Sequence, residues 1–190
     1  MKFWTIQHKS VFDILNQLGV YFPDFQKSYF VQKYPERTQL YNFLLKAFNE
    51  NNKTDVPGLI FAYFYLEDNV VRSFDSYIQF KDKMTENSYT LSKLWNEFKE
   101  RGDYYVVELE YSNLGNNFNP LFIDINDFQH LTPPILYNSI YTKDEVESIA
   151  NNLRNGISLT SRYPSNIMQG HVPAISALFN VVDVYDFFDI

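Results

Sequence analysis

The chain has no cysteine among its 190 residues, which excludes disulfide bonds, thiolate nucleophiles and cysteine-based zinc sites. Glycine is also scarce, with six residues in total. None of them has the spacing of a Walker loop or of a dinucleotide-binding fingerprint, so a P-loop or Rossmann enzyme is not expected. The sequence also lacks the Gly-x-Ser-x-Gly elbow of α/β-hydrolases.

Long apolar segments are missing too. The first residues include Gln7, His8, Lys9 and Asp13, which interrupt the run of roughly 7–15 apolar residues that a secretory signal needs. No stretch of about 18 apolar residues occurs elsewhere, so no membrane-spanning helix is expected. We therefore predict a soluble protein of the cytoplasm.

Positive charge is in deficit, because the chain has 16 Lys and Arg residues and 23 Asp and Glu residues, which gives a net charge of -7. A surface with this balance repels phosphate backbones and anionic lipids. A broad basic face for nucleic acid is therefore excluded, whereas a local basic cleft is compatible with the composition.

Aromatic residues are abundant, with 18 Phe, 15 Tyr and 2 Trp. Together with an apolar content of 45% they exclude extended disorder and supply the core of one domain. We predict a single domain over residues 1–190.

Apolar spacing predicts that helices and strands alternate along the chain. The clearest helix covers Ser10 to Leu18, with Ser10 as its N-cap and Gly19 as the terminating residue. Further helices are expected over 39–49, 73–84, 88–101 and from the Thr142–Glu145 capping box to Gly156. Strands are expected over 3–7, 59–66, 104–111 and 121–125, and again in the last forty residues.

This order of elements indicates an α+β fold with a mixed β-sheet core and flanking helices. The Gly/Asn-rich loop at 113–119 favours a hairpin between the strands at 104–111 and 121–125.

Two glutamates on one expected strand are candidate catalytic carboxylates. Glu108 and Glu110 are two residues apart, so their side chains extend from the same face of the strand. Such a pair can polarise a sugar hydroxyl or stabilise an oxocarbenium ion. The alternative is a strand whose apolar face is inward and whose two glutamates are in water.

Polar residues near the two ends of the chain are candidate ligand-binding groups. Thr5 and Gln7 alternate with Trp4 and Ile6, so the first strand has a polar face that can bind an amide or a ribose. An ordinary half-exposed strand gives the same pattern. Gln169 opens a late strand in this interpretation, and its amide can both donate and accept hydrogen bonds.

Arg162 and Tyr163 lie just upstream in an expected loop. Arg162 can pair with a phosphate and Tyr163 can stack on a ring, although a plain surface loop fits the same residues. The histidines His8, His130 and His171 are far apart in the sequence, and no metal site is expected from them.

Several segments together resemble an uncharacterised bacterial domain family. Its members open with a Trp-Thr-Ile-Gln strand, as in Trp4–Gln7, and close with a strand headed by Gln, as in Gln169–Phe187. Residues 57–65 and 121–130 share the resemblance. This family implies no particular activity.

A more distant resemblance is to the ADP-ribosyltransferase superfamily. In that superfamily a His or Arg on the first strand binds the nicotinamide ribose, and a later strand begins with the catalytic glutamate. Here Gln7 or Thr5 holds the first position and Gln169 holds the second.

This resemblance implies a role for each candidate residue. Gln169 and Glu110 are the expected catalytic groups. The expected nucleotide-binding residues are Trp4, Thr5, Gln7, Arg162 and Tyr163. NAD is the implied substrate, and a protein or a nucleic acid is the implied acceptor of ADP-ribose.

A second interpretation involves no catalysis. An acidic, aromatic-rich chain also suits an interaction protein, such as a phage or plasmid inhibitor or a toxin–antitoxin component, because Tyr, Trp and Phe are favoured interface anchors.

Overall fold

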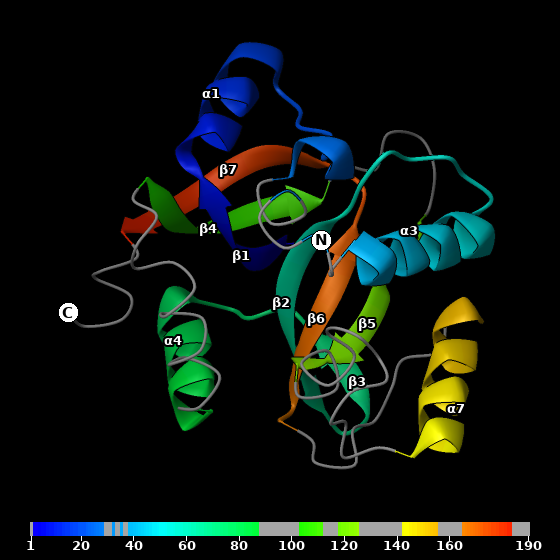
Figure 1. The fold of residues 1–190 in the computed structure, drawn as a ribbon. Helices are drawn as coiled ribbons and strands as arrows, with labels where there is room; N and C mark the ends of the chain where they lie inside the picture. The colour runs from blue at the N-terminus through cyan, green and yellow to red at the C-terminus, as the bar shows by residue number, and fades with distance from the viewer. Residues whose placement is uncertain are drawn as a thin grey trace.

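The computed structural model describes residues 2–28, 32, 35, 38–87, 103–111, 118–125, 142–155 and 165–183. The strands in these residues are β1 (Lys2–His8), β2 (Ile60–Glu67), β3 (Val70–Arg72), β4 (Tyr104–Tyr111), β5 (Leu121–Asp124), β6 (Ile167–Val172) and β7 (Ile175–Asp183). The helices are α1 (Lys9–Leu18), α3 (Thr38–Asn52), α4 (Tyr77–Glu86), α7 (Lys143–Arg154) and the short 3-10 helix η1 (Phe25–Lys27). Figure 1 shows their arrangement, and the expected α+β class is confirmed.

All seven strands belong to one sheet, in the order β5–β6–β2–β1–β4–β7, with β3 paired to β2 outside this path. Every strand pairing among the described residues is antiparallel, so the expectation of a mixed sheet is wrong. The expected hairpin between β4 and β5 is wrong as well, because β4 lies between β1 and β7 while β5 pairs with β6. A Gly/Asn-rich loop marks a turn but does not specify which strands pair after it.

The sheet is strongly curled, like half of a barrel. Only Pro173 and Ala174 separate β6 from β7, yet β2, β1 and β4 lie between these strands in the sheet. In a flat sheet β6 and β7 would be about 19 Å apart, which is four spacings of about 4.8 Å. Three residue steps span at most about 11 Å, so the strand ends must approach each other. In Figure 1, β4 and β7 accordingly run at a steep angle to β2, β6 and β5.

The ends of α1 follow from local sequence, with one difference from expectation. His8 rather than Ser10 is the N-cap, because the Nδ1 atom of His8 accepts a hydrogen bond of 3.2 Å from the backbone N–H of Ser10. Gly19 ends the helix as predicted. Its φ of 72° lies in the left-handed region, where glycine has no steric penalty, and its N–H donates to the carbonyl of Leu15.

The other helices match their expected positions with shifted ends. α3 extends to Asn52, beyond the expected end at Asn49, because the amides of Asn51 and Asn52 donate to the carbonyls of Ala47 and Phe48. These side-chain amides bind carbonyls near the end of the helix that would otherwise bind water. α4 begins at Tyr77, four residues later than expected.

The capping box of α7 is confirmed. The backbone N–H of Thr142 donates to the Glu145 carboxylate at 2.7 Å, and the N–H of Glu145 donates to the Thr142 hydroxyl at 3.3 Å. The helix expected over 88–101 and the strand segment expected over 184–187 lie outside the described residues.

Both faces of the sheet are buried. One face, which includes Phe3, Phe64 and Leu109, packs against α1, and we call it the α1 face. The other face contacts α4 through one aromatic cluster and α3 through a second cluster, and we call it the α3/α4 face. α3 and α7 lie side by side (Figure 1). None of the helices in the described part of the chain combines the length and the apolar character that a bilayer span requires.

Candidate functional site

One row of residues crosses the whole sheet on its α3/α4 face. Strand register places these six residues next to one another in the order Asn180, Glu108, Trp4, Tyr63, Gln169 and Ile123. Residues directly opposite each other in antiparallel strands extend from the same face, so all six side chains share one face. We call these six residues the central row.

The central row buries polar groups that lack partners. Trp4 is 1% exposed and Gln169 is 5% exposed. Among the described residues, neither the indole N–H of Trp4 nor the amide oxygen Oε1 of Gln169 has a hydrogen-bond partner. An orphaned buried donor or acceptor costs about 1–3 kcal/mol, so two in one row require an explanation.

Tyr63 lies between Trp4 and Gln169 in the row. Burial raises the pKa of its phenol above the ordinary value, and the nearby Tyr41 of α3 raises it further. Tyr63 is therefore a neutral phenol at physiological pH, and a neutral phenol can both donate and accept a hydrogen bond.

Helix α4 holds Trp4 in place. The Trp4 ring stacks on Phe80 with a centroid distance of 5.3 Å and an interplanar angle of 9°, and Tyr77 lies 5.6 Å away. The indole therefore has little rotational freedom, and its N–H has a defined position.

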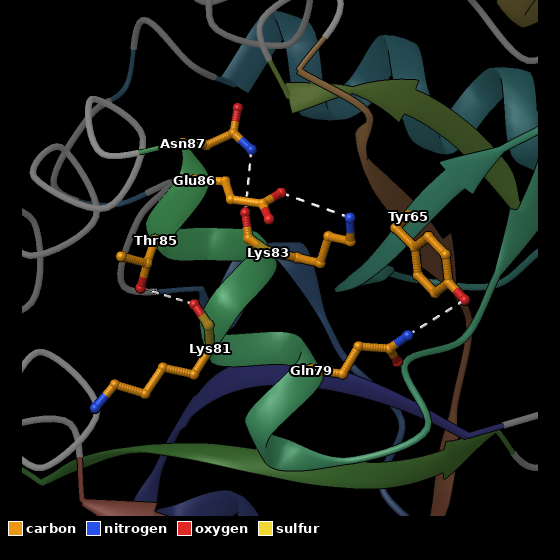
Figure 2. A network of polar contacts seen from close by, with 7 residues as sticks. All are labelled: Tyr65, Gln79, Lys81, Lys83, Thr85, Glu86 and Asn87. Carbon is orange, nitrogen blue, oxygen red and sulfur yellow. Dashed lines mark hydrogen bonds and ion pairs between the residues drawn. The ribbon is translucent and has the colours of Figure 1, made fainter.

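A capping box in turn orients α4. The N–H of Gln79 donates to the hydroxyl of Ser76 at 3.2 Å, while the Gln79 amide oxygen accepts from the N–H of Asp75 at 2.6 Å. The other end of the same amide, Nε2, lies 3.5 Å from the Tyr65 hydroxyl on β2. Figure 2 draws this contact as a dashed line. One side chain thus caps the helix and connects it to the sheet beside the central row.

Glu108 is the acidic member of the central row. It is 7% exposed, and its Oε2 accepts a hydrogen bond of 2.6 Å from the amide of Asn180 on β7, the last strand in the described sheet order. The interpretation with both glutamates in water is wrong for Glu108, because β4 is an inner strand whose two faces are both covered. Glu110 extends from the same face, one row further along the strand, opposite Lys2 and Ala177, and is half-buried.

Thr5 and Gln7 extend from the α1 face, away from the central row. The Thr5 hydroxyl donates to the carbonyl of Phe61 at 2.6 Å, and the Gln7 amide donates to Thr5 Oγ1 at 3.0 Å. In the described strands β1 and β2 pair only at Trp4 and Tyr63, so the Thr5 bond takes the place of a ladder bond where the strands diverge. Both side chains are thus hydrogen-bonded within the sheet.

The structure therefore does not bring Gln7 and Gln169 into one cleft. The two side chains belong to opposite faces of the sheet. The sequence pattern could not show this, because the relative orientation of β1 and β6 depends on their shared pairing with β2.

Gln169 lies in the middle of β6 and does not begin the strand, which corrects the sequence-based expectation. β6 begins earlier because the buried carboxylate of Asp124 fixes the turn before it. Asp124 accepts hydrogen bonds from the backbone N–H groups of Ser165 at 3.0 Å and Asn166 at 3.2 Å, and from the Ser165 hydroxyl at 2.9 Å. Arg162 and Tyr163 lie outside the described residues.

Sequence reasoning did not single out Tyr63, Asn180 or Asp124. For Tyr63 a signal was present, because alternation along residues 59–66 places Phe61, Tyr63 and Tyr65 on one face and only a tyrosine carries a polar group there. No local signal relates Asn180 to Glu108, which are distant in the sequence.

A surface hollow of about 520 Å³ lies beside α3 and is lined by Lys46, Glu50 and the turn at 53–55, among others. None of the expected site residues lines it. In the described part of the chain, no group of three or more His, Asp or Glu side chains is arranged to hold a metal ion.

Comparisons with protein-family models, curated proteins and solved structures give no match to this chain. Both family resemblances therefore stay predictions, and the central row must be interpreted from its own chemistry.

Proposed function

We propose that the chain binds NAD or a related nucleotide against the central row, with an ADP-ribosyltransferase-like fold as the sequence resemblance implies. The observation that carries this proposal is the pair of orphaned polar atoms, Trp4 Nε1 and Gln169 Oε1. One is a donor and the other an acceptor, and both are almost completely buried.

The carboxamide of nicotinamide has the complementary pattern, because its carbonyl accepts a hydrogen bond and its NH₂ group donates one. Trp4 and Gln169 are separated by two strand spacings, or about 10 Å. That span exceeds a single ring, so we expect one residue to bind the carboxamide and the other to bind the attached ribose. Tyr63 between them can contact either part.

Binding is better supported than transfer of ADP-ribose. The uncharged Gln169 cannot balance positive charge in an oxocarbenium-like transition state. Glu108 is the carboxylate of the central row and is the group that would stabilise such a charge during transfer to a protein or a nucleic acid. Glu110 lies one row further away.

The test is isothermal calorimetry with NAD on the wild type and on two variants. Gln169→Leu removes the orphaned acceptor from the central row, whereas Gln7→Ala makes a comparable change on the α1 face. We expect the wild type to bind, Gln169→Leu to weaken binding by about tenfold or more, and Gln7→Ala to bind like the wild type. Absence of binding by the wild type at millimolar NAD contradicts the proposal.

The second candidate is a non-enzymatic protein that binds a basic protein partner. It is favoured by the exposed apolar side chains of Leu18 (71% exposed) and Phe22 (49% exposed) on either side of Gly19, together with the net charge of -7. Loss of partner binding in a Leu18→Ser, Phe22→Ser double variant, with NAD binding absent in the wild type, would favour this candidate over the first.

A further inference from the structure

The aromatic side chains of η1 and α3 pack on one part of the sheet, and we call these two elements the η1/α3 layer. We propose that protonation of His171 beneath this layer opens it in acid, so that α3 separates from the sheet while α1 and α4 stay packed. This opening requires no bound nucleotide and is independent of the proposed function.

His171 lies in the sheet directly beneath the layer. It is two residues from Gln169 on β6, so its side chain also extends from the α3/α4 face. Strand register places it between Phe61 on β2 and Leu121 on β5. The imidazole contacts the Phe61 ring edge to face at 4.7 Å, and Tyr41 of α3 packs on the same ring at 5.2 Å. One phenylalanine ring therefore connects the buried imidazole to the layer.

The position of the ring makes its charged form unfavourable. Nδ1 lies 3.2 Å from the carbonyl oxygen of Leu121, so the neutral ring has its proton on Nδ1, and Nε2 gains the second proton in acid. His171 is 0% exposed, so its charged form has no hydration in the closed layer. Burial accordingly lowers the pKa of the imidazole to about 4. Opening the layer returns the ring to water and removes this cost.

The titratable groups around the ring do not compensate its charge. Tyr41 of α3 is the titratable residue on the inner side of the layer, and its phenol is buried. Asp124 of β5 extends from the other face of the sheet, because it pairs with Met168 rather than with His171. The remaining described charges of the layer are at exposed or partly exposed positions: Asp24, Lys27, Lys46 and Glu50.

The attachment of α3 is different at its two ends. Near the C-terminal end, the Asn52 amide makes two hydrogen bonds with the backbone of Asn119, of 2.7 Å and 3.1 Å. Near the N-terminal end, Tyr41 packs on Phe25 and Phe61 through its ring. We therefore expect the Tyr41 end of α3 to move away from the sheet while the Asn52 end acts as the hinge.

The rest of the described core is packed separately. α1 covers the opposite face of the sheet, and α4 packs around Trp4 and Phe80 in another cluster of the same face. The cluster beneath the η1/α3 layer is distinct from both. A charge on His171 therefore acts first on one cluster and leaves the packing of α1 and α4 in place.

The experiment is hydrogen exchange of the full chain, measured for each segment by mass spectrometry at about pH 7 and about pH 4.5 and corrected for the intrinsic exchange rate. The open form takes up a proton below about pH 6.5, whereas the closed form stays neutral down to about pH 4. The closed form therefore loses stability over this range, and the protection of α3 should fall by about 50-fold at pH 4.5. An equal fall in α1, α3 and α4, or unchanged protection of α3, would overturn the proposal.

Two variants assign the effect to His171. His171→Gln keeps a donor for the Leu121 carbonyl and cannot take up a proton, so the protection of α3 should become nearly independent of pH. His8→Asn removes an exposed histidine and keeps a good N-cap residue for α1, so it should behave like the wild type. A pH effect that persists in His171→Gln, or that disappears in His8→Asn, would contradict the role of His171.

A second measurement on the wild type decides the proposal if His171→Gln does not fold. A dye that binds exposed apolar surface should bind as the pH falls from about 6.5 to about 4, because Phe25, Tyr41 and Phe61 become accessible. The amides of α4 should remain protected over the same range. Dye binding that begins only when α4 loses protection would show global unfolding and would overturn the proposal.

Discussion

Trp4 and Gln169 flank the same β2 residue, Tyr63, although they come from opposite ends of the chain. Their shared partner places both side chains on the α3/α4 face, where one buried polar atom of each has no hydrogen-bond partner in the described part of the chain. A protein selected for stability alone would have apolar residues at these positions. The two polar atoms therefore lower the stability of the fold, and ligand binding can explain why they are present.

Replacing Gln169 by leucine should make the ligand-free protein more stable. Leucine has a similar size and removes a buried acceptor that has no donor in the described residues. We expect a gain of about 1–2 kcal/mol in the free energy of unfolding, measured by urea denaturation. A clear loss of stability would mean that Gln169 already has a partner in the ligand-free protein, and it would weaken the basis for the proposed site.

Replacing Asp124 by alanine should destabilise the protein strongly. The change leaves the backbone N–H groups of Ser165 and Asn166 without their buried acceptor. We expect a loss of about 3 kcal/mol or more in urea denaturation. Asp82→Ala, at an exposed position of α4, is the matched control and should change stability by less than about 0.5 kcal/mol.

Gly170 should not tolerate a side chain. A Cβ atom there would lie 2.6 Å from Phe64 Cε2 and 2.9 Å from Phe122 Cε1, and these two rings pack edge to face. Gly170→Ala should therefore cost about 1–3 kcal/mol in thermal or urea unfolding. Gly19→Ala has free space around it and should cost only about 1 kcal/mol, from the left-handed backbone. A smaller effect at Gly170 than at Gly19 would contradict this packing.

The helices and the inner strand β2 were predictable because their signals are local. The spacing of apolar residues in α1, the glycine at its end and the aromatic run of β2 each depend on neighbours in the sequence. The central row was not predictable in this way. Its members share a face only because of the register of six strands. Gln7 was expected on the same side of the sheet as Gln169 but lies on the opposite side, because no local signal specifies how β1 and β6 are related through β2.

The burial of Glu108 could also not be predicted from the sequence. Alternation along β4 correctly predicts that Glu108 and Glu110 share a face, but it does not show that α4 and α3 cover that face. Burial on both sides follows from the central position of β4 in the sheet, which depends on distant pairings with β1 and β7.

His171 should make stability dependent on pH in the acidic range. Burial lowers its pKa to about 4, against an opposing effect of the hydrogen bond that its Nδ1–H donates to the carbonyl of Leu121. The unfolded chain, with an ordinary pKa near 6.5, binds a proton that the folded protein does not, so stability falls as the pH drops from about 6.5 to about 4. The expected loss is about 3 kcal/mol.

The control for this prediction is His171→Gln, whose amide can still donate to the Leu121 carbonyl. Urea denaturation at several pH values should give a flatter profile for this variant than for the wild type between about pH 6.5 and pH 4. Parallel profiles would show that His171 does not cause the acid sensitivity.

The central claim is tested most directly by the NMR signal of the Trp4 indole N–H. Trp95 is the only other tryptophan, so a Trp95→Phe variant assigns the signal. During titration with NAD, we predict that the Trp4 Nε1–H resonance shifts downfield as it gains an acceptor, in the wild type and in Gln7→Ala alike. A resonance that stays unchanged at millimolar ligand would contradict the account, because the orphaned donor would then have no part in binding.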